Sequence, residues 1–519
     1  MGAVTIPQAV IESALREGDR IAIRGEDGRG IAYAALPALI ERASAGLIAR
    51  GIAPGDRIAI WAPNSPGWII AALGIQAAGA ILVPMNTRFK GAEAGYILRK
   101  SGARLLLTVP EFLGNRYPEL IAGQELPALE DVLTLDVAAG TIDPPSGLPG
   151  ADAFREARAR LAALGPDDIS DVIFTSGTTG KPKGVMTAHG QNVALIRTYA
   201  ANLGLRRDDV YLIVNPFFHA FGYKAGWFTA LLVGATALPH ASFDPLEVLG
   251  RVAAERVTML PGPPTLYQSL IAAPWRDYDL GSLRLAITGA ASVPVPLIEE
   301  MRADLGFDTV LTAYGLSENC GFVSMCRHGD PVELVAKTAG RPLPGVEIRL
   351  VDNDGGAVPT GSPGHLQVRG VGVMQGYLHD PEATARVIDA DGWLSTGDIA
   401  VVDPGGNIAI TDRSDDMFTV GGFNVYPAEI EGLLAAHPAV SQSAVIGVAD
   451  ARLGKVARAY VVLRPGRTET PEALLAWCRE NMANYKAPRA VDFVDALPTN
   501  AAGKVQRYLL RERAEQASG

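Results

Sequence analysis

An alternation of short apolar runs with helix-like stretches, between about Tyr33 and Val214, is the feature that most constrains the fold of this chain. The stretch IAYAALPALIERASAGLIARG has apolar residues at helical spacing and stops at Gly51, and DRIAIWAPN follows it as a strand. ILVPMN and ARLLLTV repeat the strand pattern, with GAEAGYILRKSG as a helix between them. Because strands that alternate with helices build parallel sheets covered by helices, we predict an α/β fold with doubly wound sheets.

The pattern of the chain changes near Gly340. The segments VEIRLVDNDGGAVPTGSPGHLQVRG and NIAITDRSDDMFTVGG are typical of β-hairpins with Asn-Asp-Gly-Gly and Pro-Gly turns, which predicts a small β-barrel-like part. After Tyr426, helix and strand patterns in PAEIEGLLAAH, SAVIGV, ARAYVVLRP and PEALLAWCRENM indicate a small α+β unit. We expect a large N-terminal domain over residues 1–412, a connecting segment over 413–416 and a small C-terminal domain over 417–519.

Charge and composition exclude several classes of function. The chain has 519 residues, and its 46 Lys and Arg residues against 56 Asp and Glu residues give a net charge of -10. This balance argues against a nucleic-acid partner, and it requires that any polyanionic ligand be held by local donors. The sparse cysteines favour a reducing cytosol over a disulfide framework, and Cys320, Cys326 and His328 lack the paired spacing of a metal site. We therefore expect buried thiols.

No segment is predicted to cross a membrane. The N-terminal residues MGAVTIPQAVIESALREGD are acidic where a signal peptide would be basic. The greasiest stretch runs from Gly67 to Met85, but its Ala and Gly content and the internal Gln76 favour a buried helix that runs into a parallel strand. We expect a cytoplasmic protein.

Three apolar strands end in loops of small or polar residues. They are RVTMLPGPP, LRLAITGAAS and DTVLTAYGLSEN. In parallel sheets, ligands bind outside the carboxyl ends of the strands. These three strand ends, far apart in the sequence, are therefore predicted to converge on one pocket.

The strongest indication of chemistry is the segment DVIFTSGTTGKPKGV, residues 171–185. A strand opens here into a loop with three glycines, four hydroxyl residues and two lysines. The glycines let backbone N–H groups approach a phosphate chain, the hydroxyl groups add short donors, and Lys183 supplies a mobile cation. The segment predicts a phosphate-binding loop rather than a plain surface loop.

At this point the sequence closely resembles the adenylate-forming superfamily, which contains acyl-CoA synthetases, nonribosomal-peptide adenylation domains and firefly-type luciferases. The family's motifs recur in order as TSGTTGKPKG, NPFFHAFG, TAYGLSE, STGD, DRSDD with its following GG, and NAAGK. The resemblance covers essentially the whole chain. It implies a reaction that couples a carboxylate to ATP, giving an acyl-adenylate and pyrophosphate, and then passes the acyl group to a thiol or an amine.

The resemblance also implies how ATP and Mg²⁺ are bound. Glu318 stands at the family's Mg²⁺ ligand, and Asp398 at the acid that accepts the ribose hydroxyls. Arg413 would contact ribose or phosphate, and Tyr314 would stack on adenine beside the flat backbone at Gly289. The residues expected at the nucleotide are Thr175, Ser176, Gly177, Thr178, Thr179, Gly180, Lys183, Gly289, Ala290, Ala291, Tyr314, Gly315, Ser317, Asp398 and Arg413.

A mobile C-terminal domain is a further implication of the resemblance. Lys504 in NAAGKV resembles the catalytic lysine that bridges the acyl carboxylate and the α-phosphate. Asp415 occupies the family's hinge position, and Gly421 and Gly422 resemble the turn that lines the pantetheine tunnel for CoA. In the family, the small domain swings after adenylation and withdraws the lysine. The candidate catalytic residues are Lys504, His219 and Glu318.

The segment NPFFHAFGYKAGWF, residues 215–228, matches the family's motif at the mouth of the acyl pocket. His219 resembles the aromatic gate between acid and nucleotide, with a buried core histidine as the alternative. Lys224 is a lone cation in a greasy segment, so we expect its ammonium to snorkel to the surface. Turned inward, it would meet a keto group or a second carboxylate of the substrate. The residues expected to line the acyl pocket are Phe218, Tyr223, Lys224, Trp227 and Asn319.

The sequence resembles one branch of the superfamily most. The segments that carry this resemblance are NPFFHAFGYKAG, PHASFDP, MLPGPPTLYQSL and LTAYGLSEN. These are the bacterial ligases that attach CoA to the methyl-indanedione propanoate left from steroid rings C and D, which implies a bulky bicyclic keto acid and CoA as co-substrate. The chain departs from this branch in two places. SENC at 317–320 replaces a segment of Thr-Glu-Ala type. SDD at 414–416 replaces a more basic hinge, and this second change would weaken CoA recognition.

Two alternative functions stay open on the sequence alone. One is an amide-forming ligase that joins the adenylated acid to an amino acid, as coronafacate-type ligases do. The other is a CoA ligase for a fatty or aryl acid. The oligomeric state is open as well, a homodimer included.

Overall fold

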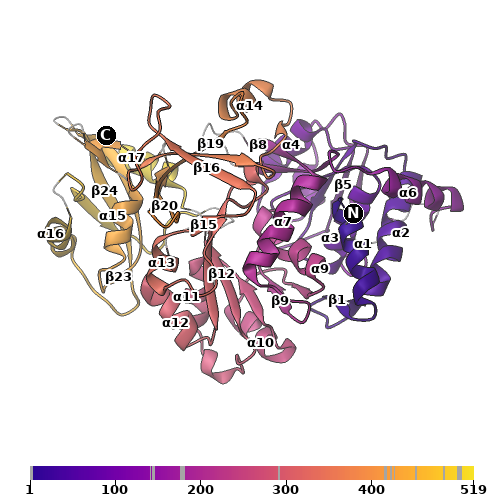
Figure 1. The fold of residues 1–519 in the computed structure, drawn as a ribbon, viewed down its shortest axis with the longest axis horizontal. Coiled ribbons are helices and arrows are strands. Elements are labelled where there is room, and N and C mark those ends of the chain that lie inside the picture. The colour runs from indigo at the N-terminus through magenta and orange to yellow at the C-terminus, as the bar shows by residue number, and fades with distance from the viewer. Residues whose placement is uncertain are drawn as a thin grey trace.

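Two large sheets, a smaller antiparallel sheet and a C-terminal sheet form the framework of the protein (Figure 1). The computed structural model describes residues 4–140, 142, 147–175, 182–289, 293–413, 416, 418–420, 423–425, 427–450, 453–482, 485–499 and 505–518. In Figure 1 the N-terminal helices α1, α2, α3 and α6 lie at one end of the long axis, β12 and helices α10 to α12 near its middle, and the C-terminal unit at the other end. This arrangement confirms the predicted α/β fold with a large N-terminal part and a small C-terminal part.

The first large sheet has seven strands in the order β18-β8-β7-β4-β3-β5-β6. The strands are β3 (Arg57–Trp61), β4 (Ile81–Pro84), β5 (Leu105–Thr108), β6 (Asp131–Thr134), β7 (Ile169–Thr175), β8 (Lys183–Ala188) and β18 (Gly376–Tyr377). Strands β7, β4, β3, β5 and β6 run parallel, whereas β8 and β18 are antiparallel at one edge. The parallel strands confirm the alternating pattern seen in the sequence.

The second large sheet has nine strands in the order β15-β14-β13-β12-β11-β9-β10-β1-β2. The strands are β1 (Ile21–Arg24), β2 (Gly30–Ala32), β9 (Val210–Ile213), β10 (Thr236–Pro239), β11 (Met259–Pro261), β12 (Leu285–Gly289), β13 (Thr309–Tyr314), β14 (Ser324–Met325) and β15 (Arg341–Pro342). The central strands β13, β12, β11, β9, β10 and β1 are parallel. Their carboxyl ends therefore share one edge of the sheet.

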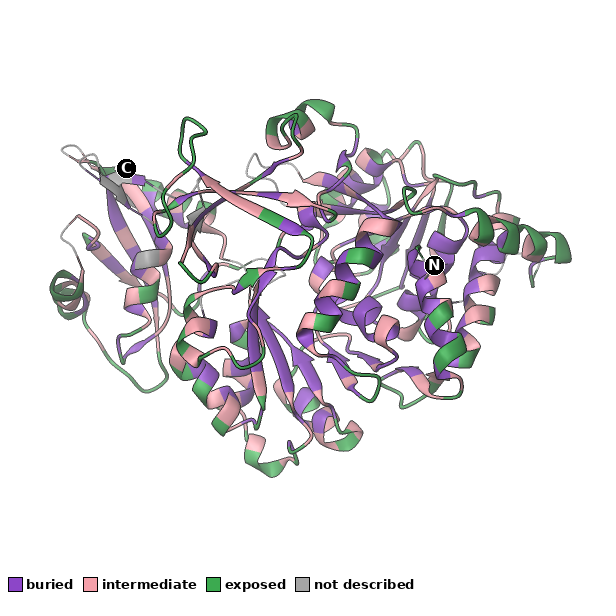
Figure 2. Ribbon diagram, in the orientation of Figure 1, coloured by how far each residue is buried: buried purple, intermediate pink, exposed green. Residues whose placement is uncertain are grey.

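Helices flank both large sheets, and their outer faces are exposed while the strands between them are buried (Figure 2). The helices are α1 (Ile6–Glu17), α2 (Leu36–Ala49), α3 (Pro66–Ala77), α4 (Gly91–Ser101), α5 (Tyr117–Ile121), α6 (Ala151–Ala163), α7 (His189–Leu203), α8 (Ala220–Gly222), α9 (Thr229–Val233), α10 (Pro245–Glu255), α11 (Pro264–Ala272), α12 (Val295–Ala303), α13 (Val332–Lys337) and α14 (Pro381–Val387). Four short helical segments are η1 (Tyr33–Ala35), η2 (Tyr223–Phe228), η3 (Trp275–Asp277) and η4 (Ser317–Asn319).

Helix α3 explains the greasiest stretch of the sequence. Its residues from Gly67 to Ala77 are all buried, and Ser65 caps the helix by accepting a hydrogen bond from the Trp68 backbone N–H at 3.2 Å. Strand β4 follows it in parallel register with β3. The prediction of a buried helix that runs into a parallel strand is confirmed. No helix among the described residues is long and apolar enough to cross a membrane.

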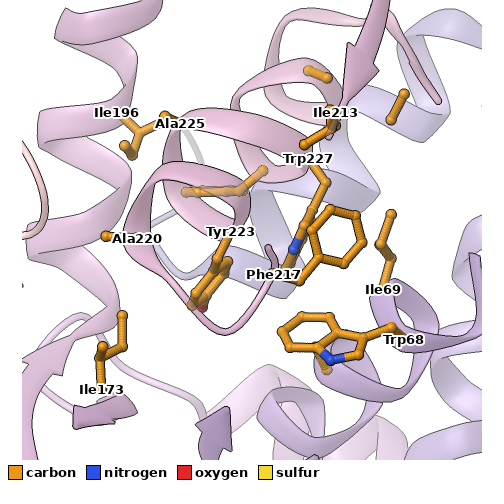
Figure 3. Packing of buried hydrophobic residues seen from close by; sticks show 14 of the residues in the cluster. Trp68, Ile69, Ile173, Ile196, Ile213, Phe217, Ala220, Tyr223, Ala225 and Trp227 are labelled. Carbon is orange, nitrogen blue, oxygen red and sulfur yellow. The ribbon is translucent and has the colours of Figure 1, made fainter. Parts of the chain in front are cut away.

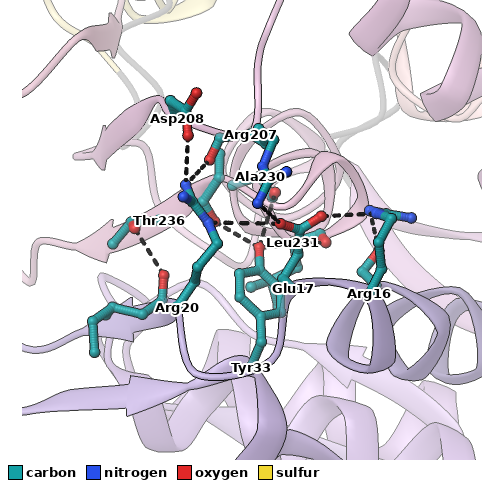
Figure 4. A network of polar contacts seen from close by, with 12 residues as sticks. Arg16, Glu17, Arg20, Tyr33, Arg207, Asp208, Ala230, Leu231 and Thr236 are labelled. Carbon is teal, nitrogen blue, oxygen red and sulfur yellow. Dashed lines mark hydrogen bonds and ion pairs between the residues drawn. The ribbon is translucent and has the colours of Figure 1, made fainter.

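A buried carboxylate fastens the end of α1 to the nine-stranded sheet (Figure 4). The Glu17 side chain is only 2% exposed, and it contacts Arg16 Nε at 2.8 Å and Arg207 Nη2 at 3.1 Å. Beside it, the Tyr33 hydroxyl donates to the Ala235 carbonyl at 2.6 Å. A carboxylate this buried is tolerated only with such partners, so the cluster holds α1 and η1 against the segments that lead into β9 and β10.

Most of the chain after β15 forms two smaller units. The first is a four-stranded sheet in the order β16-β17-β19-β20, with β16 (Val346–Val351), β17 (Gly364–Gly370), β19 (Leu394–Val402) and β20 (Ile408–Arg413). The second contains β21 (Phe418–Val420), β22 (Phe423–Val425), β23 (Val440–Asp450), β24 (Gly454–Leu463), β25 (Ala490–Phe493), α15 (Pro427–Leu434), α16 (Pro471–Asn481) and α17 (Arg507–Ser518). Its buried residues form hydrophobic clusters separate from the large core.

The three cysteines are free and buried, as expected. Within the described ranges, no group of three or more His, Cys, Asp or Glu side chains is placed to hold a metal ion.

Candidate active site

The carboxyl ends of β11, β12 and β13 meet at one edge of the nine-stranded sheet, as predicted. The strands pair in parallel register, Met259 with Leu285 and Gly289 with Ala313. Strand β9 also pairs with β11, so the segment that follows β9 and contains His219 starts from the same edge. Strand β7, which leads into the predicted phosphate loop, belongs to the seven-stranded sheet, so the predicted site residues come from both large sheets.

A tight turn after β13 carries Glu318. A Cβ atom on Gly315 would lie 1.9 Å from the Gly321 carbonyl oxygen, so only glycine allows the two backbone segments to approach this closely. Cys320 adopts a left-handed backbone with φ of 50° and ends η4. The Glu318 carbonyl then accepts a hydrogen bond from the Met374 N–H at 2.8 Å. The turn thus fixes the Glu318 backbone from both sides.

Tyr377 joins Glu318 to the phosphate loop. Its hydroxyl donates to Glu318 Oε1 at 3.0 Å, and the Lys183 Nζ lies 4.9 Å from the centroid of its ring. Burial, and then the Glu318 charge, raise the pKa of Tyr377, so the phenol stays protonated and remains a donor. Strand β18 brings Tyr377 here by pairing with Val185 of β8. No motif in the sequence marks Tyr377, and its role was not predicted.

The base of the phosphate loop is a strand pair. Thr175 ends β7 and lies opposite Lys183, the first residue of β8. The loop residues Ser176, Gly177, Thr178, Thr179 and Gly180 lie outside the described residues. Lys183 and Thr175 are therefore held at the mouth of the loop by the regular hydrogen bonding of an antiparallel pair.

Tyr314 and Asp398 are brought into direct contact. The Tyr314 hydroxyl donates to Asp398 Oδ2 at 2.5 Å, although the two residues come from β13 and β19. Asp398 is 4% exposed, and its backbone pairs with that of Arg413 on β20. Gly289 ends β12 beside Ala313. The expected adenine and ribose residues therefore converge from three strands.

Several expected site residues lie outside the described residues, which leaves their roles as predictions. They are Ala290, Ala291, Asp415, Gly421, Gly422, Lys504 and the side chain of Arg413.

His219 is the N-cap of the short helix α8, and its Nδ1 accepts a hydrogen bond from the Phe221 N–H at 3.2 Å. Its side chain is exposed to solvent, yet the protein packed around it lowers the pKa of the imidazole by desolvation. The alternative of a buried core histidine is wrong.

The segment that contains His219 is anchored by a residue that sequence reasoning missed. Asn64 Oδ1 accepts from the Phe217 N–H at 2.8 Å, and its Nδ2 donates to the Asn215 carbonyl at 2.9 Å. Asn64 follows β3, so a polar residue at the carboxyl end of a parallel strand was the available signal.

Aromatic side chains of residues 217–227 and of α3 pack against one another (Figure 3). Tyr223 and Trp227 are fully buried and stack with ring centroids 5.0 Å apart and planes at 17°. Trp68 of α3 contacts Trp227 edge-on at 6.2 Å and Phe217 at 5.3 Å. Neither Trp68 nor Phe217 was among the predicted acyl-pocket residues. Phe218, which was, is half-buried beside His219.

The expectation that Lys224 snorkels to the surface is wrong. Its side chain is 0% exposed, and its Nζ lies 3.2 Å from Asp171 Oδ1 and 2.9 Å from Thr187 Oγ1. The isolated lysine of the sequence is thus one half of a buried ion pair whose other half lies on the phosphate-loop strand. Local composition could not reveal that partner.

The residues on either side of Glu318 are buried and serve packing. Asn319 is 0% exposed and its Nδ2 donates to the Phe322 carbonyl, while Ser317 lies buried at the start of η4. Burial raises the pKa of Cys320 to about 11, although the Lys224 ammonium opposes this shift. The Cys320 thiol is therefore protonated at neutral pH and does not act as a nucleophile.

Comparison with known proteins accounts for this arrangement. Residues 10–378 match the family model of the AMP-binding enzymes, and residues 429–504 match the model of the AMP-binding enzyme C-terminal domain. The 3-[(3aS,4S,7aS)-7a-methyl-1,5-dioxo-octahydro-1H-inden-4-yl]propanoyl:CoA ligase of Mycobacterium tuberculosis (strain ATCC 25618 / H37Rv) is 49% identical over 511 residues, 98% of each chain. The ligase of the same name from Rhodococcus jostii (strain RHA1) is 47% identical over 518 residues, again 98% of each chain.

A solved structure shows the same fold with an acyl-adenylate bound. The crystal structure of the anthranilate CoA ligase AuaEII in complex with anthranoyl-AMP superposes with a TM-score of 0.88 and 29% identity, and the match covers 100% of this chain and 98% of that one. The motifs, the converging strand ends and these matches agree. The chain therefore belongs to the AMP-binding enzymes, the ATP-dependent ligases that adenylate carboxylic acids.

Proposed function

We propose that this enzyme activates a bulky bicyclic keto acid of the indane-propanoate class as its acyl-adenylate and transfers the acyl group to CoA. The observation that carries the proposal is the 49% identity to a ligase for such an acid, which extends over 98% of both chains. A match of this extent includes both domains and the segments that flank the acyl pocket. The sequence motifs resemble the same branch.

The proposed nucleotide site places donors where negative charge must be stabilised. Bringing a carboxylate to a triphosphate opposes like charges, so the site needs a cation and oriented hydrogen-bond donors. Lys183 and Thr175 stand at the base of the phosphate loop, and Asp398 stands beside Tyr314 as the acceptor for ribose. Lys504 would complete the site from the C-terminal domain by contacting the acyl carboxylate and the α-phosphate.

The donor set fits a magnesium ion shared with the nucleotide. Among the described residues, Tyr377 is the hydrogen-bond partner of the Glu318 carboxylate and occupies Oε1, which leaves Oε2 for a cation. Mg²⁺ prefers oxygen ligands and is often held by one or two carboxylates together with substrate phosphates. Glu318 would hold the ion, which when bound would neutralise phosphate charge.

The surroundings of the gate favour a bulky, rigid acid. Phe218 and the exposed His219 stand at the entrance, and the stacked pair Tyr223 and Trp227 lies behind them. Because both rings of this pair are fully buried, they support the entrance from behind, and the half-buried Phe218 is the aromatic surface that a fused ring system would contact. We propose that Asn319 and Lys224 act behind this surface and do not line it directly.

The hinge region bears on the choice of CoA as acceptor. The acidic SDD segment suggested weakened CoA recognition, but the Asp416 carboxylate is already paired with Arg507 at 3.2 Å and with Arg511 at 2.5 Å. Its charge is therefore compensated within the C-terminal domain. This removes one reason to prefer an amine acceptor, and Gly421 and Gly422 remain the proposed tunnel for pantetheine.

The test is a product assay with matched acids and acceptors. The enzyme is supplied with ATP and Mg²⁺, with an indane-propanoate diketone, a linear fatty acid or an aryl acid, and with either CoA or an amino acid. Mass spectrometry is expected to show a thioester of the bicyclic acid. An amide without thioester would support the amide-forming alternative, and a thioester formed only from fatty or aryl acids would refute the proposed substrate class.

A further inference from the structure

A fully buried ion pair joins the strand of the phosphate loop to the acyl-pocket segment. Asp171 lies on β7, the strand that ends at Thr175 where the loop begins, and Lys224 lies in η2, shortly after the gate residue His219. Both side chains are 0% exposed, and Lys224 Nζ lies 3.2 Å from Asp171 Oδ1. One contact thus connects the two parts of the protein that must bring a phosphate and a carboxylate together.

Neutral partners satisfy both charges. Asp171 Oδ1 also accepts from Thr187 Oγ1 at 2.9 Å, and its Oδ2 accepts from Ser170 Oγ at 2.7 Å and from Asn192 Nδ2 at 3.3 Å. Thr187 Oγ1 in turn accepts from Lys224 Nζ at 2.9 Å. These partners come from β7, β8 and α7, and all of them are buried. In a medium of low dielectric constant such a network is strong and geometrically specific.

The segment that carries Lys224 is not a regular α-helix. Segment η2 is a π-helix from Tyr223 to Phe228, interrupted at Gly226, whose φ of -84° and ψ of -106° are not helical. Short π-helical segments are found frequently at functional sites. A second side-chain contact, from Gln76 Nε2 to the Tyr223 hydroxyl at 2.7 Å, ties the segment to α3. Side-chain contacts therefore help to set the position of η2 where helical regularity does not.

Stability alone does not explain a buried pair of this kind. Removing two charges from water costs several kcal/mol for each ion, and a well-packed apolar pair of similar size is often equally stable or more stable. The charges add specificity, because only one arrangement of the two segments pairs them. We propose that Asp171 and Lys224 are a positioning pair that holds the segment His219–Phe228 against β7, so that the acid carboxylate meets the α-phosphate in line for adenylation. This role does not depend on which acid is bound.

The decisive variant removes both charges together. Asp171→Asn with Lys224→Met leaves no unpaired buried charge and is expected to melt within a few degrees of the wild type. Its kcat in ATP–pyrophosphate exchange is expected to fall by about tenfold or more, because small displacements of reacting groups are costly. Its KM for ATP should change by less than about threefold, since the residues proposed to bind the nucleotide are untouched.

A second ion pair of the same domain provides the matched control. Arg284 Nε lies 2.7 Å from Asp209 Oδ1, and these residues precede β12 and β9, at the edge of the sheet opposite the site. Asp209→Asn with Arg284→Met should lower the melting temperature without a comparable loss of kcat. An equal loss of kcat in both double variants would show a general effect of ion-pair removal and would overturn the proposal.

A milder variant covers the case in which the double variant does not fold. Thr187→Val keeps both charges and the shape of the side chain but removes the hydroxyl that bridges them, and Thr187→Ser restores it. A loss of kcat in Thr187→Val that Thr187→Ser recovers supports the positioning role. A folded double variant, or a folded Thr187→Val, with wild-type kcat would sink it. The assay uses whichever acid the wild-type enzyme adenylates, so a failure of the indane assignment leaves this test intact.

Discussion

Two tyrosines orient the two carboxylates proposed to contact the nucleotide and its metal ion. Tyr314 donates to Asp398 and Tyr377 donates to Glu318. Each phenol contacts one carboxylate oxygen and so fixes the direction in which the carboxylate faces. Hydrogen bonds to charged acceptors are about twice as strong as neutral ones, so these contacts hold the carboxylates in place before the nucleotide arrives.

Tyr377→Phe is expected to raise the Mg²⁺ concentration needed for half-maximal activity. The ring beneath Lys183 is kept, but the hydrogen bond to Glu318 is lost, and such a bond contributes about 1.5–3 kcal/mol. We expect kcat/KM to fall by about tenfold at low Mg²⁺ and to recover partly at high Mg²⁺. Tyr508→Phe, at a position 52% exposed on α17, is the control. An unchanged Mg²⁺ requirement would contradict the assignment of Glu318 as the metal ligand.

His189 is expected to make the stability of the protein depend on pH. Burial lowers its pKa from 6.5 to about 4, although the Asp171 and Asp168 charges oppose the shift. Its Nδ1 accepts from the Ile6 N–H at 3.3 Å, which requires that this nitrogen be unprotonated. In the unfolded chain the imidazole protonates near its ordinary pKa, so the neutral form stabilises the fold fully above that value. This stability is lost as pH falls toward the folded pKa.

The measurement compares unfolding of the wild type and His189→Gln. The contribution of His189 to the free energy of unfolding should decline by up to about 3 kcal/mol between pH 6.5 and pH 4. His189→Gln should lose stability less steeply over that range. His365→Gln, which removes a half-buried histidine on β17, controls for the loss of a histidine elsewhere. Parallel pH profiles for wild type and His189→Gln would refute the argument.

At the level of secondary-structure elements, the sequence could predict those features of the fold that depend on local residue patterns. The parallel strands, the buried helix α3 and the meeting of β11, β12 and β13 followed from periodicity and from the chemistry of strand ends. The partner of Lys224 could not be predicted, because Asp171 reaches it only through tertiary packing. For the same reason nothing in the local sequence around Tyr377 indicated that β18 pairs with β8.

The turn between β13 and η4 is the element whose geometry is most demanding. Gly315→Ala would place a Cβ atom 1.9 Å from the Gly321 carbonyl oxygen, a backbone atom that cannot rotate away. The turn must shift, and Glu318 with it. We expect a loss of about 3 kcal/mol in stability and a larger loss of adenylation than of folded protein.

A glycine in an open position provides the comparison for this turn. Gly432 lies in α15 and is exposed, and a Cβ atom added to it would have no other atom within 4 Å. Gly432→Ala should therefore stabilise the helix by up to about 1 kcal/mol and leave activity unchanged. Thermal unfolding and ATP–pyrophosphate exchange, measured on both variants, distinguish the strained turn at Gly315 from the open position at Gly432. Normal activity in Gly315→Ala would show that the turn does not set the position of Glu318.

At the scale of the whole molecule, charged contacts tie the segment after the proposed hinge to the last helix. Asp416 pairs with Arg507 and Arg511 of α17, and Arg507 also pairs with Glu431 of α15 at 2.7 Å. Helix α17 begins shortly after Lys504. These contacts join Asp416, which follows the proposed hinge Asp415, to helix α17, which follows Lys504. Asp416 and α17 therefore move together as one body. A rotation at Asp415 would then carry Lys504 with it.

Lys504→Ala provides the test of this two-state scheme. If the lysine acts only when its domain is closed over the nucleotide, the variant should lose adenylation by about a thousandfold, because a positioned cation at the α-phosphate is removed. Thioester formation from supplied acyl-adenylate should fall by less than about threefold, since under this scheme that step uses an arrangement in which the lysine is withdrawn. Lys455→Ala, at an exposed position on β24, should change neither step. Equal losses in both half-reactions would mean that Lys504 serves one fixed site, and the rotation at Asp415 would then have no catalytic purpose.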